Sequence, residues 1–69
     1  MSMVANDAEL ILQSLERGVN YKRKEVEQAA VLPYARTLRA LMRLFDQGKV
    51  GRRQLGDSIR SPYEWFLLA

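Results

Sequence analysis

The sequence predicts a small, mainly helical α+β domain in which three helices precede a C-terminal two-stranded β-hairpin. Three observations lead to this prediction. Apolar residues recur at helical spacing in three stretches, a proline-containing turn separates the second stretch from the third, and the last third of the chain changes to short strand-like segments. The 69 residues suffice for one domain, which we expect to span 1–69.

A first helix is expected over about 7–17. Asn6 can cap its start, and Glu9 follows three residues later, as in a capping box. Gly18 can adopt a positive φ and marks the expected end. Its inward-facing stripe would consist of Ala8, Ile11, Leu12 and Leu15. The following segment, 19–21, tolerates extended backbone and could form a short connecting strand.

A second helix is expected over about 22–30, followed by a three-residue turn. Val26, Ala29 and Ala30 would face the core of the domain. Pro33 lacks an N–H and therefore suits the first turn of the next helix, while the preceding Leu32 is disfavoured in helical backbone. Two helices joined by such a turn have the spacing of a helix-turn-helix.

The third helix, expected over about 33–47, has two distinct faces. With Arg36 as the origin and about 100° per residue, the residues within roughly 60° of it are Arg36, Arg39, Ala40 and Arg43. The residues between roughly 80° and 200° are Tyr34, Thr37, Leu38, Leu41, Leu44 and Phe45, with Met42 a little beyond. We therefore expect one apolar face and one face that carries three arginines, ending at Gly48.

The remaining segment, about 49–68, reads as the β-hairpin. Residues 49–55 could form its first strand, 56–58 have turn chemistry, and an aromatic strand returns after Pro62. Gly51 is expected to make the first strand short, bulged or irregular. The large side chains of the second strand are Tyr63, Trp65 and Phe66. We expect them to close the core, although a stacking platform for nucleic acid is conceivable.

Charge is distributed unevenly along the chain. The whole sequence has a net charge of +3, but residues 36–60 hold seven basic and two acidic residues, a net charge of +5. The other four basic and six acidic residues give −2. A basic half beside a mildly acidic one is an electrostatic footprint for a polyanion, although a solvated charged surface has the same composition.

These features predict a surface that binds double-stranded DNA. The third helix would read bases through Tyr34, Ala35, Arg36 and Arg39. Phosphates would be held by Lys22, Arg23, Lys24, Arg43, Arg52, Arg53 and Arg60. Two alternatives stay open: Tyr34 could belong to the core, and Lys22–Lys24 could be a solvated run paired with Glu25 and Glu27.

Other function classes find little support. The chain has no His and no Cys, so the commonest general base, the thiol nucleophile and the usual transition-metal ligands are missing. We expect no catalytic activity, no metal site, no cofactor and no small-molecule ligand. No run approaches the roughly 20 apolar residues that span a bilayer, and residues 1–6 do not resemble a signal peptide. The expected location is cytoplasmic.

The order helix, short strand, helix, three-residue turn, helix and hairpin resembles the winged-helix family. Residues 23–34 are similar to the second helix, the turn and the start of the recognition helix in many winged-helix repressors. The spaced motif Leu38-x-x-Leu41-x-x-Leu44-x-x-x-Gly48-Lys49-Val50 is similar to the rest of that helix and the first wing strand. The segment 63–67 resembles the end of small fimbrial operon regulators, the PapI/FaeA-like group.

This resemblance implies a cytoplasmic bacterial transcription regulator that binds operon DNA, often together with a larger global regulator. Its DNA-contact positions would correspond to Tyr34, Arg36 and Arg39, supported by the basic wing. A second copy of the chain is an alternative partner. The rival hypotheses are a winged-helix protein-interaction module and a phage or plasmid control protein that blocks another regulator. DNA binding would be disfavoured if acids of the same chain or a partner protein occupied the arginines of the third helix.

Overall fold

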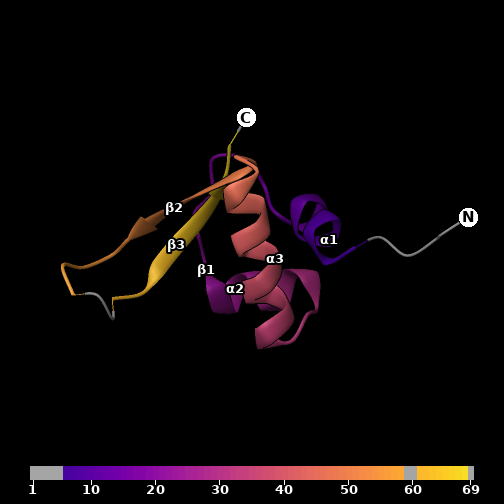
Figure 1. The fold of residues 1–69 in the computed structure, drawn as a ribbon, viewed down its shortest axis with the longest axis horizontal. Helices are drawn as coiled ribbons and strands as arrows, with labels where there is room; N and C mark the ends of the chain where they lie inside the picture. The colour runs from indigo at the N-terminus through magenta and orange to yellow at the C-terminus, as the bar shows by residue number, and fades with distance from the viewer. Residues whose placement is uncertain (1–5, 59–60, 69) are drawn as a thin grey trace, which may run out of the picture.

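The computed structural model describes residues 6–58 and 61–68, which form three helices and a three-stranded antiparallel sheet. In Figure 1 the helices gather on one side, and the last two strands extend away from them. The elements in chain order are α1 (Asp7–Ser14), β1 (Tyr21–Lys22), α2 (Arg23–Ala30), α3 (Tyr34–Asp46), β2 (Val50–Gln54) and β3 (Tyr63–Leu67).

Helix α1 begins as expected and ends early. The side chain of Asn6 accepts a hydrogen bond from the N–H of Glu9 at 2.8 Å, which confirms the predicted cap. The helix stops at Ser14, three residues before the expected end at 17. Leu15 adopts extended backbone with ψ of 151° and is buried in the core, which turns the chain toward β1. Gly18 lies in the following turn instead of ending the helix.

Helix α2 leads into the turn that the proline predicted. Within the helix Val26 and Ala30 are buried as expected, but Ala29 is exposed. Val31 caps the helix in left-handed backbone (φ 56°, ψ 52°), and the next residue, Leu32, turns back into the core. Pro33 then occupies the N-cap position of α3, so the helix starts at Tyr34, one residue later than expected.

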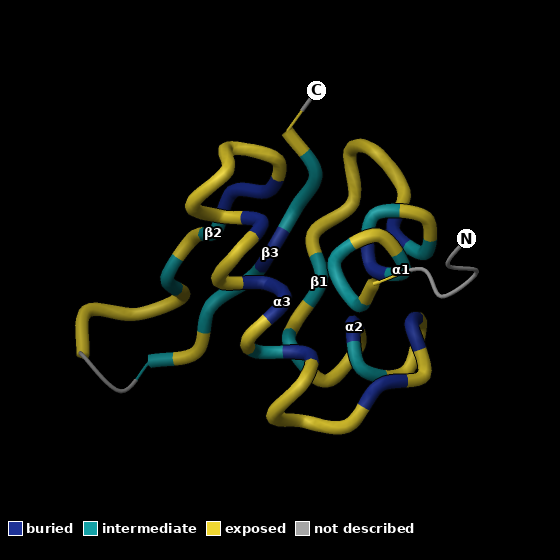
Figure 2. Tube along the Cα trace, turned by 45° about the vertical axis from the view of Figure 1, so that its right-hand side comes forward, coloured by how far each residue is buried: buried dark blue, intermediate teal, exposed yellow. Residues whose placement is uncertain are grey.

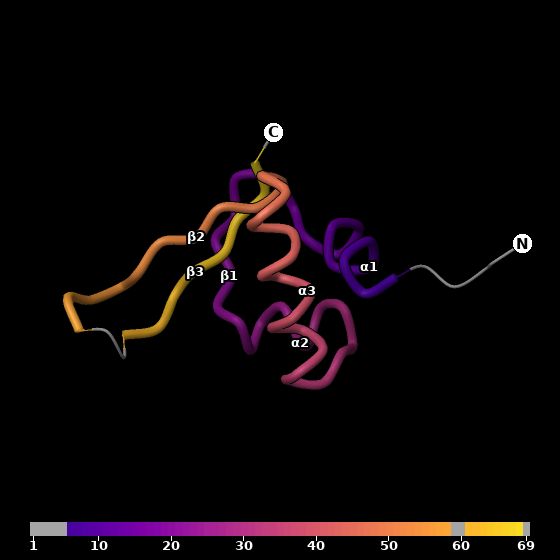
Figure 3. Tube along the Cα trace, in the orientation of Figure 1, coloured from indigo at the N-terminus to yellow at the C-terminus, as the bar shows by residue number. Residues whose placement is uncertain are grey.

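The short connecting strand expected near 19–21 forms at Tyr21–Lys22 and joins the predicted hairpin as a third strand. The strand order is β1-β3-β2, and β1 pairs with β3 through Tyr21 opposite Trp65 and Lys22 opposite Glu64. Figure 3 shows the chain of β1 alongside β3, between the hairpin and the helices. The short segment after α1 therefore connects the helical part of the domain to the hairpin through backbone hydrogen bonds.

Strand β2 is regular, contrary to the expectation that Gly51 would make it short, bulged or irregular. All five of its residues pair in unbroken register with β3, and Gly51 lies opposite Phe66. A Cβ at Gly51 would lie 2.5 Å from Cε1 of Phe66. The glycine therefore provides room for the Phe66 ring on this side of the sheet.

The core lies where α1, α2 and α3 meet the inner face of the sheet (Figure 2). Trp65 is 2% exposed, which confirms its expected core position, whereas Tyr63 and Phe66 are only half-buried. From α3 the buried residues are Thr37, Ala40, Leu41 and Leu44. Ala40 was expected on the arginine face but is buried. Conversely, Tyr34, Met42 and Phe45 were expected on the apolar face but are exposed. Because α1 packs against α3, the buried face is rotated toward the arginines.

No helix within the described part of the chain combines the length and the apolar character that crossing a bilayer demands.

Candidate functional site

The exposed face of α3 is part cationic and part apolar. The four buried residues of the helix centre on one side. At about 100° per residue, the residues near the middle of the opposite side are Ala35, Arg39, Met42 and, at the end of the helix, the acidic Asp46. One edge of this exposed face, toward α1, carries Arg36 and Arg43. The sequence predicted a face occupied by three arginines, but only Arg39 lies near the middle of the exposed side.

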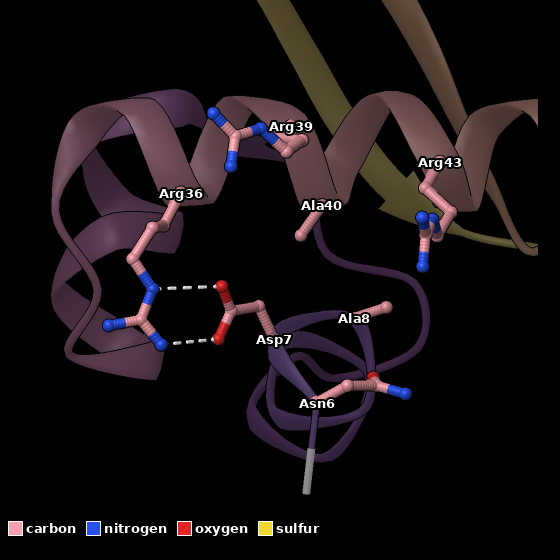
Figure 4. Close-up of a pocket in the computed structure, with 7 residues that line it drawn as sticks. All are labelled: Asn6, Asp7, Ala8, Arg36, Arg39, Ala40 and Arg43. Carbon is pink, nitrogen blue, oxygen red and sulfur yellow. Dashed lines mark hydrogen bonds and ion pairs between the residues drawn. The ribbon is translucent and has the colours of Figure 1, made fainter.

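Arg36 is held by an acidic residue of α1. Its Nε and Nη2 atoms donate to the two carboxylate oxygens of Asp7 at 2.9 and 2.6 Å (Figure 4). The Arg36 side chain is 55% exposed, and that of Asp7 is 27% exposed. Hydrogen bonding to Arg36, together with the positive charges of Arg36 and Arg39, lowers the pKa of Asp7 below its ordinary value, and burial opposes this shift only in part. The same carboxylate raises the pKa of Arg36.

Arg39 and Arg43 have no ion pair and no hydrogen bond with other described residues. Both are exposed, and Figure 4 shows their guanidinium groups apart from the pair formed by Arg36 and Asp7. The shallow pocket between α1 and α3 has a volume of about 170 Å³ and is lined by Asn6, Asp7, Ala8, Arg36, Arg39, Ala40 and Arg43. Two of the three predicted arginines are therefore available to an anion from solution.

The three basic residues at the start of α2, Lys22–Lys24, differ from one another in their contacts. Arg23 forms an i,i+4 ion pair with Glu27 at 3.2 Å, and its guanidinium carbon lies 4.3 Å from the centroid of the Tyr34 ring. Tyr34 as a whole is 54% exposed, so it is a surface residue and not a core residue. The alternative interpretation, in which this basic run pairs with the acids of α2, is therefore correct for Arg23. The carboxylate of Glu25 accepts from the backbone N–H of Lys22 at 2.8 Å.

Lys22 and Lys24 are both exposed, and their ammonium groups make no ion pair within residues 6–58 and 61–68. They border a groove of about 490 Å³ at the junction of α2, α3 and the hairpin. The groove is lined by Lys22, Arg23, Lys24, Tyr34, Leu38, Pro62, Tyr63 and Trp65. The fold thus brings the basic start of α2 next to the first turns of α3 and the start of β3.

Arg52, predicted to hold phosphate, is enclosed by aromatic side chains. Its guanidinium carbon lies 4.3, 4.6 and 5.7 Å from the ring centroids of Phe45, Tyr63 and Trp65. Its Nη1 also contacts the sulfur of Met42 at 3.5 Å. Strand alternation places Arg52 on the sheet face that packs against α3, opposite Trp65 in the register. Its charge is therefore directed at the side chains of its own chain.

The neighbouring Arg53 lies on the other face of the sheet. Its side chain is 67% exposed and contacts the carboxylate of Glu64 across the strand pair at 3.5 Å. Arg60, the remaining predicted phosphate contact, lies outside the described residues. Of the two predicted phosphate contacts in the described part of the hairpin, Arg52 therefore faces its own chain and Arg53 is open to solvent.

Asp7 is the site residue that the sequence analysis missed. The helix dipole favours an acidic residue in the first turn of a helix, and this local effect explains Asp7 without any distant partner. Its partner Arg36 lies 29 residues later in the chain. No local pattern indicates that pair, because it depends on how α1 packs against α3.

Comparisons with known proteins found no matching family model, no similar curated protein and no similar solved structure. Any functional conclusion therefore depends on the geometry and charge of this chain alone.

Proposed function

We propose that this protein is a small winged helix-turn-helix regulator that binds double-stranded DNA and controls transcription. One observation carries the proposal: an unpaired arginine, Arg39, lies near the middle of the exposed face of α3, and the unpaired Lys22 and Lys24 border a groove at the first turns of the same helix. The three-residue turn between α2 and α3 and the hairpin that follows are compatible with this architecture.

In this proposal α3 lies in the major groove with its exposed face toward the base edges. Arg39 reads bases, because its guanidinium can donate two hydrogen bonds to guanine, and Ala35 allows close approach of the helix. Arg43, Lys22 and Lys24 hold phosphates on either side. Tyr34, stacked under Arg23, contributes its exposed hydroxyl at the start of the helix.

The hairpin has a smaller part in binding than its composition suggested. Arg52 supports the packing of β2 against α3, and the carboxylate of Glu64 beside Arg53 opposes its contact with a phosphate. The surface that we propose for DNA is therefore centred on α3 and the start of α2.

The decisive experiment is a titration with a random-sequence 30-base-pair duplex at two salt concentrations. The three proposed phosphate contacts, from Lys22, Lys24 and Arg43, predict a log–log salt slope of roughly −3. Changing both Lys22 and Lys24 to Ala removes two of these contacts, and the slope should flatten by about 1.8. The matched control is the Arg17→Ala, Lys49→Ala double variant, which loses the same charge near Leu67 and Leu68, at the other end of the sheet.

The two double variants separate a specific surface from a general effect of net charge. Loss of affinity in the lysine variant alone supports the proposed surface. Equal losses in both variants would show that the surface is misplaced. If the unchanged protein does not bind the duplex at low salt, DNA binding itself is rejected.

Two observations favour a second candidate, a protein-interaction module. An acid of the same chain already occupies Arg36, and the exposed face of α3 includes large apolar side chains: Tyr34, Met42 and Phe45 are 54%, 39% and 37% exposed. A partner protein could cover this mixed surface, since interfaces are enriched in Tyr, Phe, Met and Arg. Failure of the duplex titration would leave this module as the conclusion.

A further inference from the structure

We infer that Asp7 competes with DNA for Arg36 and thereby weakens the binding of DNA; this inference rests on the proposed DNA-binding function. Asp7 lies on α1, outside the helix-turn-helix, and reaches the edge of the exposed face of α3. In the free protein Asp7 therefore occupies one of the three arginines that α3 would otherwise present to DNA.

The contact has the geometry that Arg36 would use on DNA. Both carboxylate oxygens of Asp7 accept from one edge of the guanidinium, through Nε and Nη2. This paired arrangement is the one in which arginine binds two acceptors at once, whether a carboxylate, a phosphate or the O6 and N7 atoms of guanine. DNA can use the Nε–Nη2 edge of Arg36 only after Asp7 releases it, and it reaches the remaining Nη1–Nη2 edge only beside the negative charge of Asp7.

The pair is accessible enough for such an exchange. The Arg36 side chain is 55% exposed, so a DNA acceptor can approach it from solvent. Exposed ion pairs stabilise proteins only weakly, so a well-placed acceptor can replace the carboxylate. A DNA site that places acceptors near Arg36 supplies new hydrogen bonds in place of the ion pair. A site without such acceptors leaves Arg36 bound to Asp7 and also meets the negative charge of Asp7.

Asp7 is specific in this role among the described acids. Within residues 6–58 and 61–68, no acid forms an ion pair with Arg39 or Arg43. Glu9 lies in the same first turn of α1, and its side chain makes no ion pair there. Glu9 therefore offers a matched control for the charge and the position of Asp7.

The test measures the affinity of Asp7→Asn and Glu9→Gln for a random-sequence 30-base-pair duplex at two salt concentrations. Both variants raise the net charge by one, but only Asp7→Asn frees Arg36. We expect Asp7→Asn to bind about two- to fivefold more tightly than Glu9→Gln, in keeping with the strength of an exposed ion pair. Its salt slope should be steeper by about 0.9, the contribution of one additional phosphate contact.

The same pair of substitutions in an Arg36→Ala background completes the test. There the gain from Asp7→Asn should fall most of the way to that of Glu9→Gln, because Arg36 is gone and only the weaker electrostatic effect of Asp7 on Arg39 remains. Equal affinities for the two single variants, or an undiminished gain without Arg36, would overturn the inference while leaving DNA binding intact. If neither the unchanged protein nor any variant binds the duplex at low salt, the proposed function fails and the role of Asp7 fails with it.

Discussion

Gly51 and Phe66 lie opposite one another in the β2–β3 pair, and the ring of Phe66 occupies the space that a side chain at position 51 would need. Glycine usually weakens a strand because it has no side chain to pack. Here its missing side chain is what allows a large aromatic ring to approach the backbone of β2. The relationship makes the hairpin sensitive to a single added methyl group.

Gly51→Ala should therefore destabilise the protein by about 1 kcal/mol, because a Cβ 2.5 Å from Cε1 of Phe66 forces the ring to move. Urea unfolding measures the free energy. In a Phe66→Ala background the clash is absent, and Gly51→Ala should be neutral or stabilising by up to about 1 kcal/mol. Equal destabilisation in both backgrounds would mean that the ring is not the obstacle.

Val31→Gly should stabilise the protein by about 0.5–1 kcal/mol. Val31 has φ of 56° and is 85% exposed, so a β-branched side chain bears the strain of left-handed backbone and gains little burial. The comparison is Ala29→Gly, an exposed position within α2, which should destabilise by about 0.5–1 kcal/mol. Chemical denaturation of the two variants in parallel would show opposite signs; a loss of stability in both would refute the strain at Val31.

Arg52→Ala should cost about 1–2 kcal/mol of stability, because the arginine covers Phe45 and Tyr63 and interacts with their rings. Arg53→Ala, which removes only an exposed cross-strand ion pair, should change stability by less than about 0.5 kcal/mol. Thermal unfolding monitored by circular dichroism distinguishes them. Similar small effects for both arginines would mean that the aromatic contacts of Arg52 do not support the fold.

Asp7 should titrate below the ordinary range of an aspartate, because Arg36 donates two hydrogen bonds to the ionised carboxylate. The folded-state pKa is lower than the unfolded one, so the pair contributes stability above the unfolded pKa and loses it as the pH falls through the folded pKa. NMR titration of the carboxyl carbon measures this directly. In Arg36→Ala the pKa should rise toward its ordinary value; an unchanged pKa would contradict the pairing.

Much of the secondary structure follows from local signals. Asn6 caps α1 and Pro33 takes the N-cap position of α3, because capping and proline effects act between residues a few positions apart. Gly48 adopts a φ of 74° just after α3, where the sequence predicted the end of the helix. The hairpin strands also lie within the predicted region 49–68. Each of these features depends on the backbone preferences of single residues and their near neighbours.

The sequence by itself determined the order of the helices and the hairpin, the turn before α3 and the uneven distribution of charge. The tertiary structure alone decided which face of α3 is buried, since the small side chain of Ala40 faces the helix α1 that packs against α3. It also decided that Asp7 binds Arg36 and that aromatic rings enclose Arg52. These contacts join residues from different elements. They depend on how the elements pack in space, and helical or strand periodicity carries no information about that packing.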